Sequence, residues 1–313
     1  MRGLSQLFVD DLQNGCLNCF LRAVKADDTL CMEIREDYVN IYYRGGSLYR
    51  IRNMGNHTYS IDFDMNYLRH DYSLLSHFDT ALFHQLQNNQ GPYEEYVRFI
   101  PAIKTEMDLW FGEHPKYERE YQQLVLRENS YSEGVAKDSD YFILDIEYTD
   151  ANSKGRFDML AVKWLSTSSQ RRNAQNASLA LIEMKYADGA HGGSSGIAKH
   201  FKDIESFLSS PERIEALINE AENIFNQKLE LGLIKGIKPQ SIHFNHSTDS
   251  LEFIILAANH KPASTVFHRE LRSAYQMTNL SALAEIKIAT ASNMGYGLYA
   301  DHMVDLEKYL NQK

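Results

Sequence analysis

The sequence predicts an α/β protein in which a mixed sheet is flanked by helices and is preceded by an N-terminal α+β module. Short β-rich runs separated by turns fill residues 29–64, and helical periodicity covers about residues 74–126. From residue 141, three strands are followed by helices, a fourth strand and closing helices. That order is typical of an α/β sandwich with a mixed sheet. We therefore predict an N-terminal module of residues 1–110 and a main domain of residues 111–313.

Composition and length are those of an ordinary globular protein. The 313 residues are 43% hydrophobic and 24% charged, which is close to the average for such proteins. No apolar run approaches the ~20 residues needed to cross a bilayer, and Asp10 and Asp11 stand where a signal peptide would be apolar. Three cysteines in a chain of this length indicate a reducing compartment. We expect a cytoplasmic protein with no membrane contact.

The N-terminal module begins with apolar residues at helical spacing from Leu4 to Ala23. Cys16 and Cys19 share that spacing, and no second C-x-x-C pair exists to complete a zinc site. We therefore interpret both cysteines as small core residues. The strands predicted for the meander that follows are residues 30–34, 38–43, 47–51 and 58–63.

Prolines interrupt the helical periodicity of residues 74–126. The pattern breaks at Pro92 and is bent or broken at Pro101, because proline lacks the N–H that a helix interior needs. Pro115 opens a further helix, since the N–H groups of a first turn have no partner within the helix. This last helix leads into the main domain.

The main domain alternates strands with helices. After the third strand, Ile197, Phe201 and Leu208 share one face of a predicted helix, and a second helix follows Pro211. The fourth strand is apolar throughout, as a central strand usually is. The strands predicted here are residues 141–148, 156–165, 178–186 and 251–258.

Three charged residues lie inside two of these apolar strands. Glu183 and Lys185 are two residues apart, so both side chains leave the same face of the third strand. A hairpin between the second and third strands would bring Asp158 beside them. Charged groups buried among apolar residues are unstable unless they pair with each other or with a metal ion. The alternative is a buried ion pair with one solvated carboxylate.

The E-x-K pattern alone has little specificity. About one match is expected by chance in a chain of this size, and a second match occurs at Glu285 and Lys287. That second match has no aspartate in a preceding apolar strand, whereas Glu183 has Asp158 one strand earlier. The first match is therefore the better candidate.

Two carboxylates and a lysine are the groups that metal-dependent phosphodiester hydrolysis needs. Mg²⁺ prefers oxygen ligands, commonly one or two carboxylates completed by water and phosphate. A bound cation offsets phosphate charge and makes a coordinated water more acidic. A lysine beside it can orient the attacking water and stabilise the developing charge. This chemistry is the reason to consider Asp158, Glu183 and Lys185 together.

The residues Gly-Arg-Phe-Asp ending at Asp158, followed one strand later by Ile-Glu-Met-Lys ending at Lys185, resemble the PD-(D/E)XK nuclease superfamily. The resemblance covers roughly residues 114–260. It implies a restriction-endonuclease-like α-β-β-β-α-β core, with Asp158 and Glu183 as ligands of Mg²⁺ or Mn²⁺. It also implies that Lys185 lies near the nucleophilic water.

Many members of that superfamily add a glutamate from the helix that precedes the first strand. Glu118 and Glu120 both match that place in this chain. Neither is clearly favoured by the pattern of buried residues on the helix. We take Glu118 as the candidate, and the alternative is a solvated helix glutamate.

Four further residues are candidates for contact with the substrate. In the resembling proteins the helix after the third strand often presents a polar residue to the scissile phosphate, and Lys199 and His200 lie near its start here. Free N–H groups at a helix N-terminus also favour phosphate. The alternative is a surface lysine and a boundary histidine. Arg171 and Arg172, in the polar loop between the motif strands, are expected to touch the nucleic-acid backbone near the metal.

We therefore expect a metal-dependent nuclease that hydrolyses phosphodiester bonds of nucleic acid, with DNA as the expected substrate and a homodimer allowed. The alternative is a catalytically silent nuclease-like domain that serves as a binding or regulatory module in a defence or repair complex. The net charge of −10 favours the alternative, because proteins that grip phosphates usually carry a basic face. The intact Asp158, Glu183 and Lys185 favour the enzyme.

Overall fold

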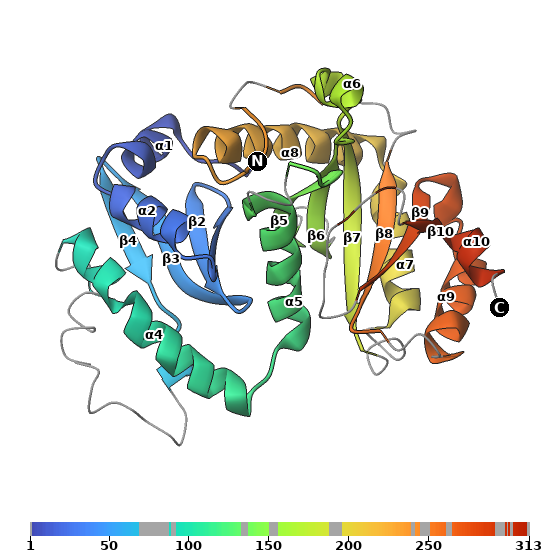
Figure 1. The fold of residues 1–313 in the computed structure, drawn as a ribbon, viewed down its shortest axis with the longest axis horizontal. Coiled ribbons are helices and arrows are strands. Elements are labelled where there is room, and N and C mark those ends of the chain that lie inside the picture. The colour runs from blue at the N-terminus through green and yellow to red at the C-terminus, as the bar shows by residue number, and fades with distance from the viewer. Residues whose placement is uncertain are drawn as a thin grey trace. The chain divides into compact units, whose positions relative to one another are not determined.

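The computed structural model describes residues 2–68, 88, 92–132, 137–149, 156–187, 196–238, 242–244, 251–260, 265–291, 298, 300 and 303–311. The chain divides into two compact units, Met1–Gln123 with Glu230–Leu233 and Leu124–Leu229 with Ile234–Lys313. A four-stranded antiparallel sheet lies in the first unit and a six-stranded mixed sheet lies in the second (Figure 1). The protein is therefore a mixed α/β fold with helices flanking its sheets.

The first sheet is a meander with the strand order β1-β2-β3-β4. Arg44 and Gly45 both have positive φ in the two-residue turn between β2 and β3, as do Asn56 and His57 between β3 and β4. Such turns match the twist of the strands that they join. All four predicted strands are confirmed. Their bounds are β1 (Leu30–Ile34), β2 (Tyr38–Tyr43), β3 (Gly46–Gly55) and β4 (Thr58–Asp62).

The single N-terminal helix that the sequence predicts is instead two helices, α1 (Gln6–Gln13) and α2 (Asn18–Ala26). Asn18 Nδ2 donates a hydrogen bond of 3.2 Å to the carbonyl oxygen of Leu12, so its side chain satisfies a carbonyl at the end of α1. Gly15 lies in the turn, where an added Cβ would come within 2.2 Å of Asp11 Oδ1. The prediction of one continuous helix is wrong. The spacing of apolar residues does not reveal a turn that is closed by a side-chain hydrogen bond.

Pro101 lies inside α4 (Tyr93–Glu113), which continues on both sides of it. A proline in a helix interior costs about 3 kcal/mol. Burial of the apolar side of α4, including Ile100, Ile103 and Met107, offsets that cost. α4 is followed by α5 (Tyr117–Leu126) and by one π-helical turn, Arg127–Tyr131. The predicted helix between residues 74 and 91 lies outside the described residues, except for residue 88.

The second sheet has the strand order β10-β9-β8-β7-β6-β5. β5, β6 and β7 are antiparallel neighbours, whereas β7, β8 and β9 run parallel. The four predicted strands are confirmed, but the prediction that only helices follow the fourth is wrong. The strands are β5 (Tyr141–Thr149), β6 (Arg156–Lys163), β7 (Ser178–Tyr186), β8 (Glu252–Ala258), β9 (Glu285–Ala291) and β10 (Val304–Asp305).

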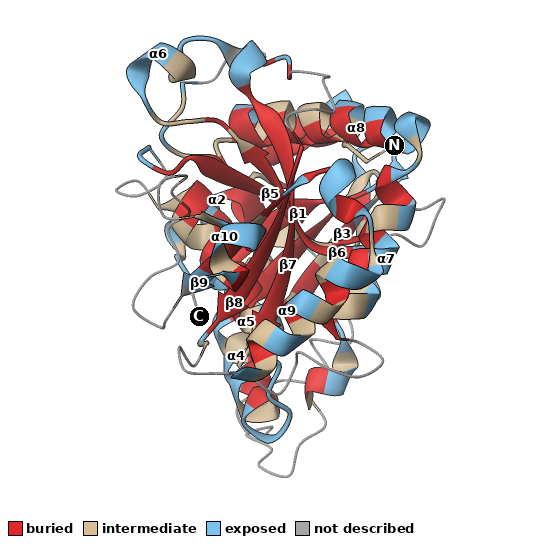
Figure 2. Cartoon of the chain, turned by 90° about the vertical axis from the view of Figure 1, so that its right-hand side faces the viewer, coloured by how far each residue is buried: buried red, intermediate tan, exposed pale blue. Residues whose placement is uncertain are grey.

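Helices α7, α8, α9 and α10 of the second unit pack on one face of this sheet through a large apolar cluster. Leu179 and Leu181 of β7 belong to it, together with Phe201 and Ile204 of α7 and Leu271 of α9. Figure 2 shows the central strands buried, while α7 and α9 also carry exposed residues. No helix in the described part of the chain is long and apolar enough to span a membrane. The helices are α6 (Ser168–Arg171), α7 (Ile197–Leu208), α8 (Pro211–Glu230), α9 (Thr265–Met277) and α10 (Leu306–Leu310).

A buried carboxylate joins β5, β6 and β8. Glu252 is 1% exposed and accepts hydrogen bonds of 2.7 Å from Tyr141 Oη and 2.5 Å from Lys163 Nζ. Burial and the adjacent Glu252 carboxylate raise the pKa of Tyr141 well above its ordinary value. The Tyr141 hydroxyl therefore stays a donor to Glu252, and Lys163 supplies the compensating charge.

Lys163→Met is expected to destabilise the second unit by about 2–3 kcal/mol, because it leaves the Glu252 carboxylate buried without a cation. Urea denaturation followed by the fluorescence of the buried Trp164 would measure the loss. Adding Glu252→Gln removes the charge and should recover part of it. A change of less than about 0.5 kcal/mol would show that the pair contributes little.

Candidate functional site

Asp158 and Glu183 stand opposite each other where the ladder between β6 and β7 stops. The last backbone pair of that ladder is Met159 with Ile182, and one residue further along brings Asp158 opposite Glu183. Asp158 is 8% exposed, and its Oδ2 accepts a 2.8 Å hydrogen bond from the backbone N–H of Met184. The side chain of Asp158 is thus tied directly to β7.

Lys185 and Glu183 form a buried ion pair on β7. The distance from Lys185 Nζ to Glu183 Oε1 is 2.7 Å, and the two side chains are 4% and 3% exposed. Leu179 and Leu181 precede them at the same two-residue spacing and lie in the apolar cluster under α7. Glu183 and Lys185 therefore continue that buried row on the helix-covered face, as the sequence spacing predicts.

His200 of α7 completes the cluster from the helix side. Its Nδ1 lies 2.9 Å from Glu183 Oε1 and its Nε2 lies 3.2 Å from Lys185 Nζ. Phe201, the next residue, is buried in the apolar cluster and helps to fix α7 on the sheet. Lys199 does not join the group: its side chain is 57% exposed and its Nζ lies 3.9 Å from Asp203 Oδ2.

The environment of Glu183 keeps it ionised. Burial by itself would raise the pKa of this carboxyl, but the hydrogen bond from His200 and the charge of Lys185 outweigh burial and lower it. At neutral pH Glu183 is therefore a carboxylate, the form that can bind a cation. Its present partners are the His200 imidazole and the Lys185 ammonium group. Each lies beside the carboxylate at a position where a metal cation would also be attracted.

The donors suit a hard cation held mostly by water and substrate. Within the described ranges, no three His, Cys, Asp or Glu side chains form a group that could hold a metal ion. Asp158 and Glu183 supply two carboxylates on adjacent strands. Mg²⁺ is commonly held by one or two carboxylates and keeps several waters, whereas structural zinc needs four protein ligands. The pair fits Mg²⁺ or Mn²⁺.

No protein-family model, curated protein or solved structure matches this chain. The resemblance to PD-(D/E)XK nucleases therefore depends on Asp158, Glu183 and Lys185 and on the strands that carry them.

Arg171 and Arg172 lie at the other end of β6. They follow Lys163, the last residue of that strand, and Lys163 is five residues or about 17 Å along the strand from Asp158. Arg171 Nη2 donates to the carbonyl oxygens of Ser139 and Trp164 at 2.7 and 2.9 Å. Burial lowers the pKa of its guanidinium. The structure does not bring these arginines to the candidate site, and Arg171 instead holds main-chain carbonyls.

The two helix glutamates differ in their surroundings. Glu120 accepts hydrogen bonds of 2.9 and 3.2 Å from Arg44, whereas Glu118 is half-buried in the first turn of α5. Both belong to the first compact unit. The ion pair with Arg44 gives Glu120 a structural role within that unit. Glu118 stays a prediction.

The second E-x-K match lies on β9 in a more exposed setting. Lys287 Nζ is 2.6 Å from Asp305 Oδ1 and also bonds Glu285, and the two carboxylate side chains are 57% and 53% exposed. An exposed ion pair of this kind contributes little to stability. Glu183 and Lys185 are buried, whereas this second pair is not. The difference agrees with the choice of Glu183 and Lys185, from the sequence, as the better E-x-K candidate.

Asp145 is a further buried carboxylate on β5, completely inaccessible to solvent. It pairs in register with Leu160, two residues from Asp158 on β6, next to a β-bulge. Its neighbour Glu147 accepts a hydrogen bond of 2.5 Å from Arg156. Asp145 thus lies on a strand adjacent to the candidate site, whereas Glu147 is held in an ion pair by Arg156.

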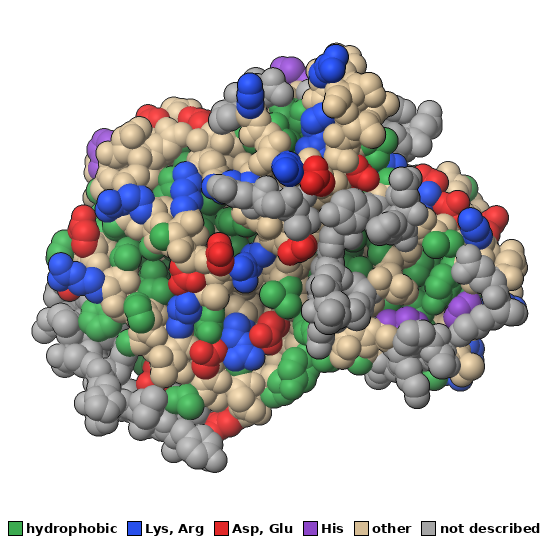
Figure 3. Space-filling view, viewed as in Figure 1, with side chains coloured by type: hydrophobic (Ala, Val, Ile, Leu, Met, Phe, Trp, Pro, Cys, Tyr) green, Lys and Arg blue, Asp and Glu red, His purple; other side chains and the backbone are tan. Residues whose placement is uncertain are grey.

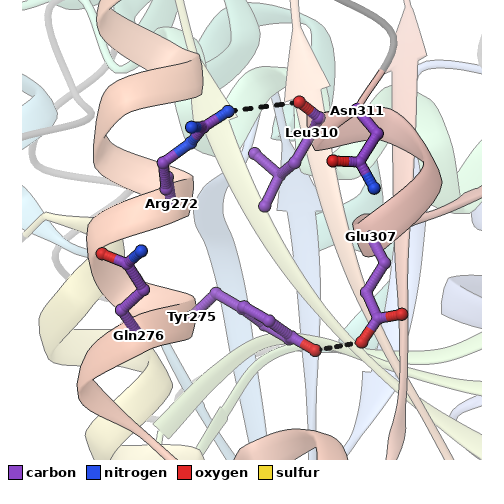
Figure 4. Close-up of a pocket in the computed structure, with 6 residues that line it drawn as sticks. All are labelled: Arg272, Tyr275, Gln276, Glu307, Leu310 and Asn311. Carbon is purple, nitrogen blue, oxygen red and sulfur yellow. Dashed lines mark hydrogen bonds between the residues drawn. The ribbon is translucent and has the colours of Figure 1, made fainter.

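A shallow cavity of about 270 Å³ lies between α9 and α10. Figure 4 shows that Arg272 bonds the carbonyl oxygen of Leu310 and that the Tyr275 hydroxyl bonds Glu307. These contacts engage Arg272, Tyr275 and Glu307 with groups of the cavity wall. The cavity shares no residue with the Asp158 cluster and suggests no chemistry of its own.

Basic side chains do not dominate the surface drawn in Figure 3. Lysine and arginine side chains are scattered there among acidic ones, in keeping with a net charge of −10. Association with a polyanion is expected to be sensitive to salt. Binding of nucleic acid would have to depend on local contacts near the site.

Proposed function

We propose that the protein is a Mg²⁺- or Mn²⁺-dependent nuclease whose second unit has a restriction-endonuclease-like fold. The observation that carries the proposal is the position of Asp158, Glu183 and Lys185. All three are buried and lie on adjacent strands. Glu183 and Lys185 continue the row of β7 that packs under α7, and Asp158 accepts the backbone N–H of Met184, the residue between them. Such a concentration of charge in an apolar sheet has a large desolvation cost.

The order of elements supports the same proposal. In chain order α5, most of which lies in the first unit, precedes the antiparallel strands β5, β6 and β7, then α7 and α8 follow, and β8 pairs parallel to β7. Apart from the additional α8, this is the α-β-β-β-α-β order that the resemblance implies. β9 and β10 extend the sheet beyond β8.

Each residue has a distinct role in the proposed reaction. Asp158 and Glu183 would hold the cation through carboxylate oxygens. A bound Mg²⁺ would make its coordinated water more acidic and offset the charge of the phosphate. Lys185 would orient the attacking water and stabilise negative charge on the phosphoryl oxygens. The water oxygen bonds to phosphorus, the bond from phosphorus to the leaving sugar oxygen breaks, and that oxygen takes up a proton.

A second candidate function is a catalytically silent nuclease-like module that binds a partner or nucleic acid in a defence or repair complex. The net charge of −10 and the mixed surface in Figure 3 favour this candidate. It predicts binding without turnover. The two candidates are therefore separated by activity and not by affinity.

Cleavage of DNA is expected in Mg²⁺ or Mn²⁺ and not in chelator. The assay would present single- and double-stranded DNA and RNA to the protein at low salt, where contacts with phosphates are strongest. The exposed Glu285 offers a matched control, since Glu285→Gln alters the other E-x-K match and should cut at the wild-type rate. Binding of a substrate without cleavage of any of the four would favour the silent module.

A further inference from the structure

Glu183, Lys185 and His200 form a closed triangle of polar contacts. The three distances are 2.7 Å from Lys185 Nζ to Glu183 Oε1, 2.9 Å from His200 Nδ1 to the same oxygen, and 3.2 Å from His200 Nε2 to Lys185 Nζ. The histidine side chain is 20% exposed, while the other two side chains are almost fully buried. Both ring nitrogens of His200 are thus used inside the protein.

The chemistry of the three groups fixes where the ring proton must be. An ammonium group only donates hydrogen bonds, and an ionised carboxylate only accepts them. Nε2 must therefore accept from Lys185 while Nδ1 donates to Glu183. Acceptance from Lys185 by Nε2 leaves the proton of the neutral ring on Nδ1, which lies 2.9 Å from Glu183 Oε1. The opposite tautomer would set two donors against each other at Nε2 and leave no donor at Nδ1 for Glu183.

We propose that His200 is a positioning residue that sets the direction of the Lys185 ammonium group and the orientation of the Glu183 carboxylate. This inference rests on the proposed nuclease function and gives His200 a role different from contact with the scissile phosphate. With one hydrogen of Nζ directed to Glu183 and another to His200, rotation of the ammonium group about its Cε–Nζ bond is restricted. The direction of its remaining hydrogen is then set before substrate binds.

Replacing His200 by asparagine or by glutamine can test the contacts of its two ring nitrogens separately. The amide nitrogen of asparagine can take the place of Nδ1, and the amide oxygen of glutamine can take the place of Nε2. His200→Ala should lower kcat about tenfold with KM changed less than about twofold, since a ground-state phosphate contact is not lost. His200→Gln should recover much of the rate by accepting from Lys185. His200→Asn should not, because it keeps only the contact with Glu183.

His243 provides a matched control. It also places Nδ1 at 2.9 Å from a glutamate oxygen, Glu222 Oε1, but its side chain is 75% exposed and lies outside the triangle. His243→Ala should therefore leave kcat and KM unchanged. A rise in KM without loss of kcat in His200→Ala would overturn the positioning role and favour direct contact with phosphate. Equal loss of rate in His200→Gln and His200→Ala would also overturn it.

The tautomer can be measured without any substrate. In protein labelled with ¹⁵N-histidine at about pH 8, above the ordinary histidine pKa, the His200 ring should show a protonated Nδ1 and an unprotonated Nε2. Comparison with the His200→Gln spectrum assigns the signals. A proton on Nε2 would overturn the inference whether or not the protein cleaves nucleic acid. Lack of cleavage by the wild type would instead count against the proposed nuclease.

Discussion

Lys185→Ala is expected to abolish cleavage while leaving metal binding nearly intact. A charged ammonium group cannot ligate Mg²⁺, so its role must concern the attacking water or the phosphate. Removing a group that acts mainly on the transition state should lower turnover by ~10²-fold or more. Turnover on a nonspecific DNA substrate and Mn²⁺ affinity by calorimetry would measure the two effects separately.

The metal affinity of this variant is informative in its own right. Lys185 Nζ lies 2.7 Å from Glu183 Oε1, so the ammonium group competes with a cation for the same carboxylate. Its loss should tighten Mn²⁺ slightly, because both carboxylates lose a neighbouring positive charge. Glu183→Gln should instead lose activity and metal binding together. This opposite behaviour distinguishes a lysine that serves catalysis from a residue that only builds the metal site.

Stability must be measured beside activity. Removing one partner of a buried ion pair costs about 3–5 kcal/mol, and both partners are almost fully buried here. Lys185→Met retains most of the side-chain volume and serves as the second variant if the alanine protein fails to fold. If either folded variant cuts at the wild-type rate, Lys185 is a structural counter-ion and the catalytic assignment is wrong.

Long apolar strands could be predicted accurately from the sequence. β7 has the predicted bounds, residues 178–186, because an apolar run rich in Leu and Ile can be buried only in a sheet or a core helix. β9 was missed, although Ile286 and Ile288 alternate with polar residues as in a half-buried strand. Such a short alternation becomes a strand only through its parallel pairing with β8, and pairing partners are not visible in local sequence.

The candidate site could be predicted as far as the alternation of side chains along a strand determines it. A spacing of two residues puts Glu183 and Lys185 on one face, and the hairpin brings Asp158 opposite. The two nitrogen contacts of His200 depend on how α7 packs on the sheet, which periodicity does not give. For Arg171, sequence proximity to the motif strands was misleading, since the loop after β6 starts at the end of the strand away from Asp158.

Addition of Mg²⁺ or Mn²⁺ is expected to raise the melting temperature, and Asp158→Asn is expected to remove that increase. Two neighbouring carboxylates repel each other without a cation, and Lys185 neutralises only part of their charge. A ligand that binds only the folded protein stabilises it by about 2.7 kcal/mol at a hundred times its Kd. Thermal melts with cation and with chelator, for wild type and variant, would measure the effect.

Asparagine is the informative substitution at this position because it separates charge from hydrogen bonding. Asp158 Oδ2 accepts the N–H of Met184 at 2.8 Å, and the amide oxygen of asparagine can accept the same bond. The fold should therefore persist while the charge that attracts the cation is lost. Asp305→Asn removes an exposed carboxylate on β10 and should leave the cation effect unchanged. A cation effect of wild-type size in Asp158→Asn would place the metal elsewhere and remove the main support for the nuclease proposal.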